Sequence, residues 1–89
     1  MQTRRMRLLR EKHSIPILEL GRHCDASPQR LTQIELGMGT VTTHMNRLVE
    51  TAFSRLIESR KQELASLEAD FQKYRKSLLD FIDEREGAV

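Results

Sequence analysis

Several residue types that mark disulfide-bonded, catalytic or membrane-spanning proteins are scarce in this sequence. It has one cysteine, two prolines, four glycines and no tryptophan among 89 residues. One cysteine excludes an internal disulfide, and we expect Cys24, which lies in an apolar helical pattern, to pack as a small hydrophobic side chain. No apolar run approaches the roughly 18–20 residues that span a bilayer, and the amino terminus lacks the apolar core of a signal peptide. We therefore expect a cytoplasmic protein without membrane contact.

The residue patterns of enzymes are also missing. His13, His23 and His44 stand ten and twenty-one residues apart, without the CxxC or HExxH spacing of a metal site. The sequence has no glycine-rich phosphate loop and no alternating strand pattern to carry one. A chain this short also has a small core, with little room for a catalytic pocket. The sequence therefore predicts no enzymatic activity, no metal and no cofactor.

The charges of the chain are unevenly distributed. Residues 1–62 contain eleven Lys or Arg and six Asp or Glu, a balance of +5, whereas residues 63–89 contain four and seven, a balance of −3. This distribution is expected if the amino-terminal part meets the phosphates of a nucleic acid and the carboxy-terminal part has another task. A simple solvated surface is the alternative reading of the same charges.

Residues 16–37 are predicted to form two short helices joined by a tight turn. Pro16 and Pro28 each suit a first helical position, and Ser27 can accept a hydrogen bond from a free N–H group of the second helix. A glycine inside the first helix predicts a point where the two helices approach closely. The first helix places apolar or small residues at i, i+3, i+4 and i+7, namely Ile17, Leu20, Gly21 and Cys24.

The second helix, residues 28–36, has two different faces. At about 100° per residue, Leu31 and Ile34 lie on one side, which we expect to join the core. The opposite side carries side chains able to contact DNA bases, namely Gln29, Thr32, Gln33 and Leu36.

The segment ELGRHCDASPQRLTQIELG resembles the helix-turn-helix of the lambda-repressor and Cro-like (Xre-type) DNA-binding family, and the resemblance covers about residues 3–56. It implies that the second helix enters the major groove of double-stranded DNA. It further implies an ion pair between Arg10 and Glu35. Asp25 stands where a turn glycine is usual, and aspartate tolerates left-handed geometry well. The base-reading residues implied are Pro28, Gln29, Thr32, Gln33 and Leu36.

A further helix, ahead of this helix pair, is predicted for residues 3–12, with apolar contacts from Met6, Leu8 and Leu9. Gly37 is the expected end of the recognition helix. Phosphate contacts are expected from basic and hydroxyl side chains around that helix, namely Arg4, Arg5, Arg7, Arg30, Thr42 and Thr43. For each of the first three arginines, simple exposure to solvent is an equally good reading.

A long carboxy-terminal helix is the second informative feature, since no Gly or Pro occurs between Val41 and Gly87. Its first part, residues 45–56, has a wide apolar stripe suited to closing the core. Unbroken to Arg85, it would measure roughly 68 Å at about 1.5 Å per residue. Beyond the stripe, a seam with alternate spacings of four and three residues is typical of a coiled coil, and its apolar members are Phe53, Ile57, Leu64, Leu67, Phe71, Tyr74, Leu78 and Phe81, with Arg60 as the one charged member.

These patterns predict an all-α protein with about four helices. Residues 1–57 form a helix-turn-helix DNA-binding domain, and residues 58–89 form a helical extension. The seam can pair with a second chain, fold back at a break near residues 58–62, or dock on a protein partner. Flanking charges leave the orientation of a pair open, because a parallel pair sets Asp70 against Arg75 but also Glu63 against Glu68.

Two functions compete at this stage. The first is a sequence-specific transcriptional regulator, a repressor, that binds a palindromic operator as a homodimer through residues 28–36. The alternative is an antitoxin-like or mobile-element accessory protein whose carboxy-terminal helix binds another protein.

Overall fold

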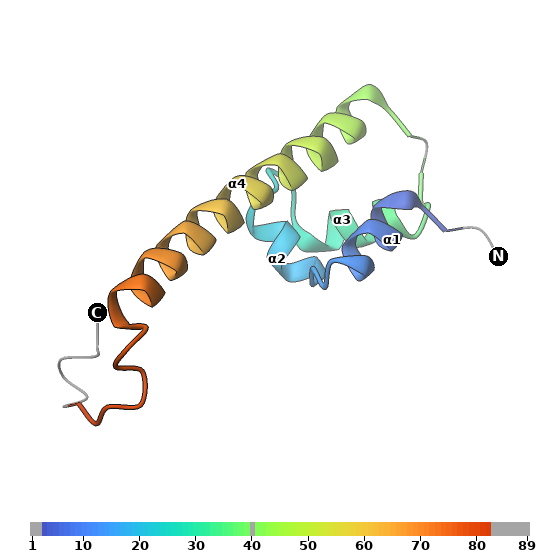
Figure 1. Ribbon diagram of the computed structural model, residues 1–89. Coiled ribbons are helices and arrows are strands. Elements are labelled where there is room, and N and C mark those ends of the chain that lie inside the picture. Colours follow the sequence, from blue (N-terminus) through green and yellow to red (C-terminus); the bar gives the residue numbers. More distant parts are fainter. Residues whose placement is uncertain (1–2, 40, 83–89) are drawn as a thin grey trace.

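The computed structural model describes residues 3–39 and 41–82, in which three short helices lie beside one end of a long fourth helix (Figure 1). The elements are α1 (Arg5–Lys12), α2 (Ile17–Arg22), α3 (Pro28–Glu35) and α4 (Thr43–Tyr74). The prediction of an all-α fold of four helices with a long last helix is confirmed. None of the helices in the described ranges is long and apolar enough to cross a membrane.

Helices α1 and α3 end with the same hydrogen-bonding motif. After α3, the N–H of Gly37 donates to Ile34 O (3.1 Å) and the N–H of Met38 donates to Gln33 O (3.0 Å). After α1, the N–H groups of residues 14 and 15 make the equivalent bonds at 3.2 and 2.8 Å. This pattern needs a left-handed residue after the helix, and Gly37 fills that place with a φ of 81°. In α1 the same place is taken by Ser14, with a φ of 53°.

The close approach of α2 and α3 depends on Gly21. A Cβ atom at this position would lie 3.0 Å from Cγ of Pro28, closer than neighbouring groups normally allow. Ser27 caps α3 as expected, because its hydroxyl accepts a hydrogen bond from the N–H of Arg30 at 3.1 Å. The predicted helix crossing at a small residue is therefore present.

The core lies between α2, α3 and the first half of α4. Its buried residues are Ile15, Leu20, Leu31, Ala52 and Leu56, and Met6 packs against them from α1. The expectation that Leu8 and Leu9 also contribute is wrong, since their exposed fractions are 56% and 43%. Leu8 is about 200° from Met6 around α1 and faces away from the core, whereas Leu9, one turn after Met6, borders an open groove beside Ile57 and Leu64.

Helix α4 runs without a break through residues 58–62, which removes the folded-back alternative. It ends at Tyr74 and not at Arg85, which lies outside the described residues. The N–H and the hydroxyl of Ser77 both donate to Tyr74 O, at 2.9 and 3.4 Å, in place of the next helical bond. Leu78 and Phe81 therefore follow the helix and do not continue its seam. At about 1.5 Å per residue, α4 is roughly 48 Å long.

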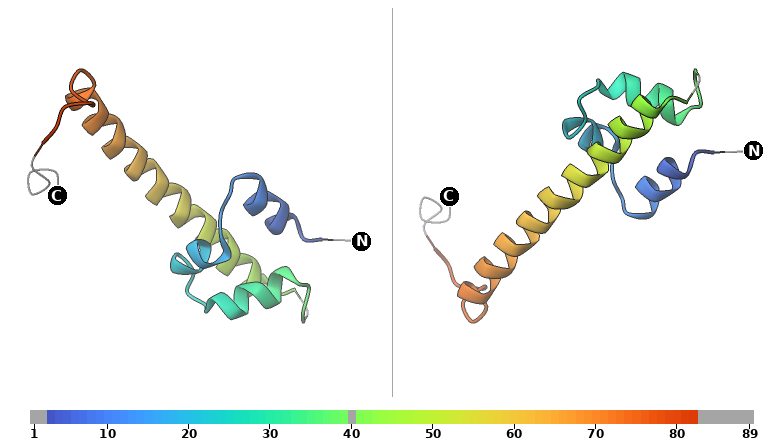
Figure 2. Two further views of the ribbon diagram at one scale, coloured as in Figure 1. Left: turned by 90° about the horizontal axis from the view of Figure 1, so that it is seen from below. Right: turned by 90° about the horizontal axis from the view of Figure 1, so that it is seen from above.

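The contacts of the domain with α4 extend beyond the predicted boundary at residue 57. Arg60 donates two hydrogen bonds to the carboxylate of Glu19 in α2, at 3.0 and 2.9 Å. Arg55 donates to Asp25 at 2.8 Å. Asp25 has no positive φ, so the turn between α2 and α3 does not need a glycine at this position. The second half of α4 projects away from the domain (Figure 2).

Candidate nucleic-acid interface

Helix α3 separates its core face from its outer face as the helical periodicity predicts. Leu31 and Ile34 are buried, whereas Gln29, Thr32 and Gln33 are exposed. The hydroxyl of Thr32 donates to Pro28 O at 3.0 Å, so that its methyl group is the part left for an outside contact. Three exposed polar side chains on a rigid helix are suited to reading the edges of bases.

The outer face of α3 borders a shallow hollow of about 410 Å³ that it shares with the start of α2. Gln29, Thr32, Gln33 and half-buried Pro28 line the α3 side of this hollow. Leu18, from α2, lines the other side and is exposed, a surface role that the helical pattern did not predict. Leu36, the last predicted base-reading residue, is also exposed and follows directly after α3.

Basic side chains lie near both ends of α3. Arg30 is exposed in its first turn. Arg4 lies near its other end, where the guanidinium Nη2 would be 3.9 Å from a Cβ placed on Gly37. Arg5 is exposed, whereas the side chain of Arg7 donates to Glu11 one turn along α1 at 3.0 Å. Of the predicted phosphate-binding arginines, Arg7 is therefore the one held by a local ion pair.

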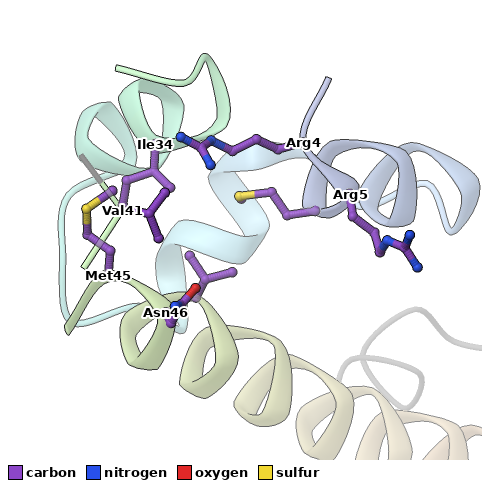
Figure 3. Close-up of a pocket in the computed structure, with 8 residues that line it drawn as sticks. Arg4, Arg5, Ile34, Val41, Met45 and Asn46 are labelled. Carbon is purple, nitrogen blue, oxygen red and sulfur yellow. The ribbon is translucent and has the colours of Figure 1, made fainter. Parts of the chain in front are cut away.

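Arg4 borders a cavity of about 270 Å³ between the start of α1 and the start of α4 (Figure 3). Its side chain extends along the rim towards Ile34, while Arg5 points away from that residue. Asn46 approaches the cavity from α4, and the Nε of Arg4 is buried without a hydrogen-bond partner. Arg4 thus keeps hydrogen-bonding capacity that its own chain leaves unused.

Thr42 and Thr43 stand at the start of α4. The Thr42 hydroxyl oxygen accepts a hydrogen bond from the N–H of Met45 at 3.1 Å, so Thr42 caps this helix. Its hydroxyl hydrogen remains able to donate to an outside acceptor such as a phosphate oxygen. Thr43 is exposed beside it in the first turn, where free N–H groups favour anions.

An ion pair between Arg10 and Glu35 fixes α1 to the end of α3. Nε and Nη2 of Arg10 each donate to one carboxylate oxygen of Glu35, both at 2.9 Å. Nη1 of the same guanidinium donates to Ile15 O at 3.0 Å. The two side chains are only 15% and 8% exposed, and the hydrogen bond to Glu35 raises the pKa of Arg10. The pair that the family resemblance implied is present.

The pair of Glu19 with Arg60 was not anticipated from the sequence. The hydrogen bond from Arg60 holds the pKa of Glu19 below its usual value, and the same bond raises the pKa of Arg60. The available signal was Arg60 itself, a charged residue at a seam position that favours apolar side chains. This contact directs Arg60 towards α2, so the amino-terminal part of the seam faces its own domain.

The predicted oligomerisation residues divide into three groups. Phe53 is half-buried and packs against the core of its own domain. Leu78 and Phe81 are exposed beyond the end of α4. The remaining members form an exposed row on α4, namely Ile57, Leu64, Leu67, Phe71 and Tyr74.

Within residues 3–39 and 41–82, no group of three or more His, Cys, Asp or Glu side chains is placed to hold a metal ion. Cys24 is a half-buried free thiol, and its sulfur accepts a hydrogen bond from the N–H of Ala26 at 3.4 Å. Comparison with family models, with curated proteins and with solved structures found no match to the chain.

Proposed function

We propose that this protein is a sequence-specific DNA-binding transcriptional regulator, a repressor, that places α3 in the major groove and binds a palindromic operator as a homodimer. The observation that carries the proposal is the exposed polar face of α3, with Gln29, Thr32 and Gln33 beside one another on a helix anchored by Leu31 and Ile34. Glutamine can bond N6 and N7 of adenine together, and the methyl group of Thr32 suits a thymine methyl.

The surroundings of α3 support the same proposal. Arg30 and Arg4 supply positive charge near its two ends, and the capped start of α4 offers free N–H groups. Such groups bind phosphate oxygens and set the position of a recognition helix in the groove. The Arg10–Glu35 pair holds the far end of α3 in a fixed orientation, which base readout requires.

The direct test is selection of DNA from a random pool by the full-length protein at a stated, moderate salt concentration. Enrichment of an inverted repeat is the expected result, and loss of that enrichment in the Gln29→Ala/Gln33→Ala double variant would assign the readout to α3. A matched control is Gln62→Ala/Gln72→Ala, which alters two exposed glutamines of α4 outside this face. Absence of any enriched sequence with the unaltered protein would contradict the proposal.

The exposed apolar row on α4 favours a second candidate function. A chain with residues such as Leu64, Leu67 and Phe71 in solvent needs a partner surface, and an antitoxin-like or accessory protein would supply it by binding another protein. In that case the purified protein stays monomeric at all concentrations tested, and a distinct protein binds α4. Sedimentation of the purified protein separates this candidate from the homodimer.

A further inference from the structure

The second half of α4 carries an apolar strip that no part of the described chain covers. Ile57, Leu64, Leu67, Phe71 and Tyr74 are 47–65% exposed, and we refer to these five residues as the α4 strip. From Leu64 onward they recur every three or four residues along one side of the helix, and Ile57 lies two turns before Leu64 with Arg60 at the seam position between them, which is the spacing of a helix-pairing surface. A contiguous apolar surface of this kind marks an interaction site.

The strip continues into a groove between α1 and α4. Leu9 and His13 form one wall of this groove, Ile57 and Leu64 lie in its floor, and its volume is about 380 Å³. The exposure of Leu9, which the core leaves unexplained, belongs to the same surface. The strip therefore leads to a hollow that can receive a large apolar side chain.

The position of the domain disfavours a parallel pair. Phe53 stands on the same seam as the strip, one turn earlier, and packs with Leu56 against the core of its own domain. Paired helices have their axes about 8–10 Å apart. A parallel, in-register pair would bring Phe53 of both chains to this distance, where each chain already has its own domain (Figure 2). An antiparallel pair avoids this clash, because each domain lies beyond the end of the other helix.

One antiparallel register matches the lengths of the strip and the helix. With Leu64 opposite Leu67 of a second copy, Ile57 lies opposite Tyr74 of that copy. Helix α4 ends at Tyr74, and the α1 wall of the groove stands beside Ile57. The end of one helix thus falls where the domain of the other copy begins.

Charged residues beside the strip favour the same register. In this register, Lys61 of each copy lies beside Glu68 of the other, which is attractive, and Glu63 of each copy lies beside Asp70 of the other, which is repulsive. Each contact occurs twice because the pair is symmetric, so attraction and repulsion balance. A shift of one heptad in one direction sets Glu68 against Glu68 and Lys61 against Arg75. A shift in the other direction sets Lys61 against Lys61 and Glu63 against Glu63. Both shifted registers contain only like-charge pairs among these residues.

The area available suits a specific dimer. The strip and Leu9 are about half exposed, and large side chains of this kind have accessible surfaces of about 200 Å² each. Burying them removes on the order of 600 Å² per chain, or about 1,200 Å² for a symmetric pair, which reaches the range of stable interfaces.

We propose that two copies of this chain pair antiparallel through residues 57–74 of α4, and that Tyr74 of each copy enters the groove beside Leu9 and Ile57 of the other. The pairing deepens the homodimer of the proposed function. Its tests use the protein without DNA, so a failure here is distinguishable from a failure to bind DNA.

The orientation is measured with spin labels on the full-length chain. Ser54→Cys in a Cys24→Ala background labels an exposed position of α4 outside the strip. The two-fold axis passes between residues 65 and 66, so two labels lie about 35 Å apart along the helices in the antiparallel pair. A parallel pair gives a distance under about 20 Å, which would overturn the proposal.

A single charge reversal tests the register. Glu68→Lys weakens the antiparallel dimer several-fold, because the new lysine meets Lys61 of the second copy, and adding Lys61→Glu restores the affinity. In a parallel pair the same lysine meets Glu63 and strengthens the dimer. The sign of the change in the dimer dissociation constant, measured by sedimentation equilibrium, therefore decides between the two arrangements.

The strip itself is tested by Leu67→Glu, which is expected to make the protein monomeric. Ala65→Glu is the matched control, since it adds the same charge at an exposed site outside the strip and leaves the dimer intact. Unaltered protein that sediments as a monomer at hundreds of micromolar, or equal effects of the two substitutions, would overturn the proposal.

Discussion

Two residues occupy the same backbone position at the ends of α1 and α3 with different side chains. Ser14 and Gly37 each follow a helix with a positive φ, of 53° and 81°. A residue with a Cβ atom pays about 1–2 kcal/mol in this conformation, whereas glycine adopts it freely. The helix end after α1 is therefore strained in a way that the end after α3 is not.

The expected consequence is a matched pair of opposite stability changes. Ser14→Gly should raise the free energy of unfolding by about 0.5–1 kcal/mol, after allowance for the greater flexibility of glycine in the unfolded chain. Gly37→Ser should lower it by a similar amount, since a Cβ there meets no atom closer than 3.9 Å and only the backbone strain is added. Urea denaturation followed by helical circular dichroism measures both. Changes of the same sign would contradict this account.

Base readout by α3 is also a prediction about single residues. Gln29→Ala or Gln33→Ala should weaken binding to the selected operator by about 1–3 kcal/mol and relax the preference at one position in each half-site. Arg30→Ala should instead weaken binding to all sequences and reduce its salt dependence, because a phosphate contact carries no sequence information. Binding to the operator and to single-base variants at two salt concentrations distinguishes these outcomes. A uniform loss with both glutamine variants would contradict their role.

At the scale of the helices, ion pairs between different elements hold the domain together. The Arg10–Glu35 pair is largely removed from solvent, so deletion of one member leaves a buried charge without its partner. Glu35→Ala should lower the free energy of unfolding by about 3 kcal/mol or more, a large share of the stability of a small domain. The Arg10→Met/Glu35→Leu double variant should recover most of the loss, because no charge remains to be satisfied.

The exposed pair within α1 is the control for this experiment. Arg7 and Glu11 are both about half exposed, and Glu11→Ala should change stability by no more than about 0.5 kcal/mol. Denaturation curves of the three variants, recorded together, give the comparison. A cost of Glu35→Ala as small as that of Glu11→Ala would show that the Arg10–Glu35 pair contributes little.

The contact between α2 and α4 should make stability depend on pH. Arg60 lowers the pKa of Glu19 in the folded protein through its hydrogen bond, while the unfolded carboxyl titrates near about 4.3. The stabilising effect is therefore complete above the unfolded pKa and is lost as the pH falls through the lower, folded pKa.

Glu19→Gln removes this titration and supplies the test. The variant should have a lower free energy of unfolding than the unaltered protein near neutral pH. The difference between the two free energies should shrink as the pH falls below about 4. Asp25→Asn, which alters an exposed acidic residue paired with Arg55, is a control for general acid effects. If the difference in the free energy of unfolding between the Glu19 variant and the unaltered protein stays constant with pH, the titration of Glu19 does not cause the pH dependence.

At the scale of the whole molecule, the antiparallel pair determines how far apart two recognition helices stand. Side chains of α3 share the core and a neighbouring cavity with residues 45–56 of α4, whereas the two-fold axis lies between residues 65 and 66. At about 1.5 Å per residue, the two copies of α3 are separated by on the order of 50 Å along the helix pair. This exceeds the spacing of about 34–36 Å for half-sites one helical turn apart.

Half-sites on one face of DNA lie a whole number of turns apart, and a separation of about 50 Å falls between one turn and two, so the dimer is expected to require one fixed spacing of about 10 or 20 base pairs between half-site centres. Operators with synthetic spacers test this, with binding best at one whole-turn spacing and reduced by half-turn changes. Leu67→Glu should abolish the dependence on spacing while leaving binding to a single half-site. Equal binding at every spacing would contradict a rigid pairing of the two recognition helices.

Local sequence rules determined much of the domain. The capping of α3 by Ser27, the end of α3 at Gly37 and the buried face of Leu31 and Ile34 each depend on residues within one or two helical turns. Such interactions are the same in any fold, because the backbone geometry of a helix fixes which side chains are neighbours. The resemblance to a helix-turn-helix family added the Arg10–Glu35 pair.

The tertiary structure alone decided the rest. Arg60 and Glu19 are forty-one residues apart, and their contact depends on the angle at which α4 crosses α2. Leu9 also stays outside the core, in the lining of a groove that it shares with Ile57 and Leu64 of the α4 strip. Periodicity shows that a helix has an apolar side, but not which length of it the chain's own domain will cover. That division depends on contacts between distant segments, which only the folded chain defines.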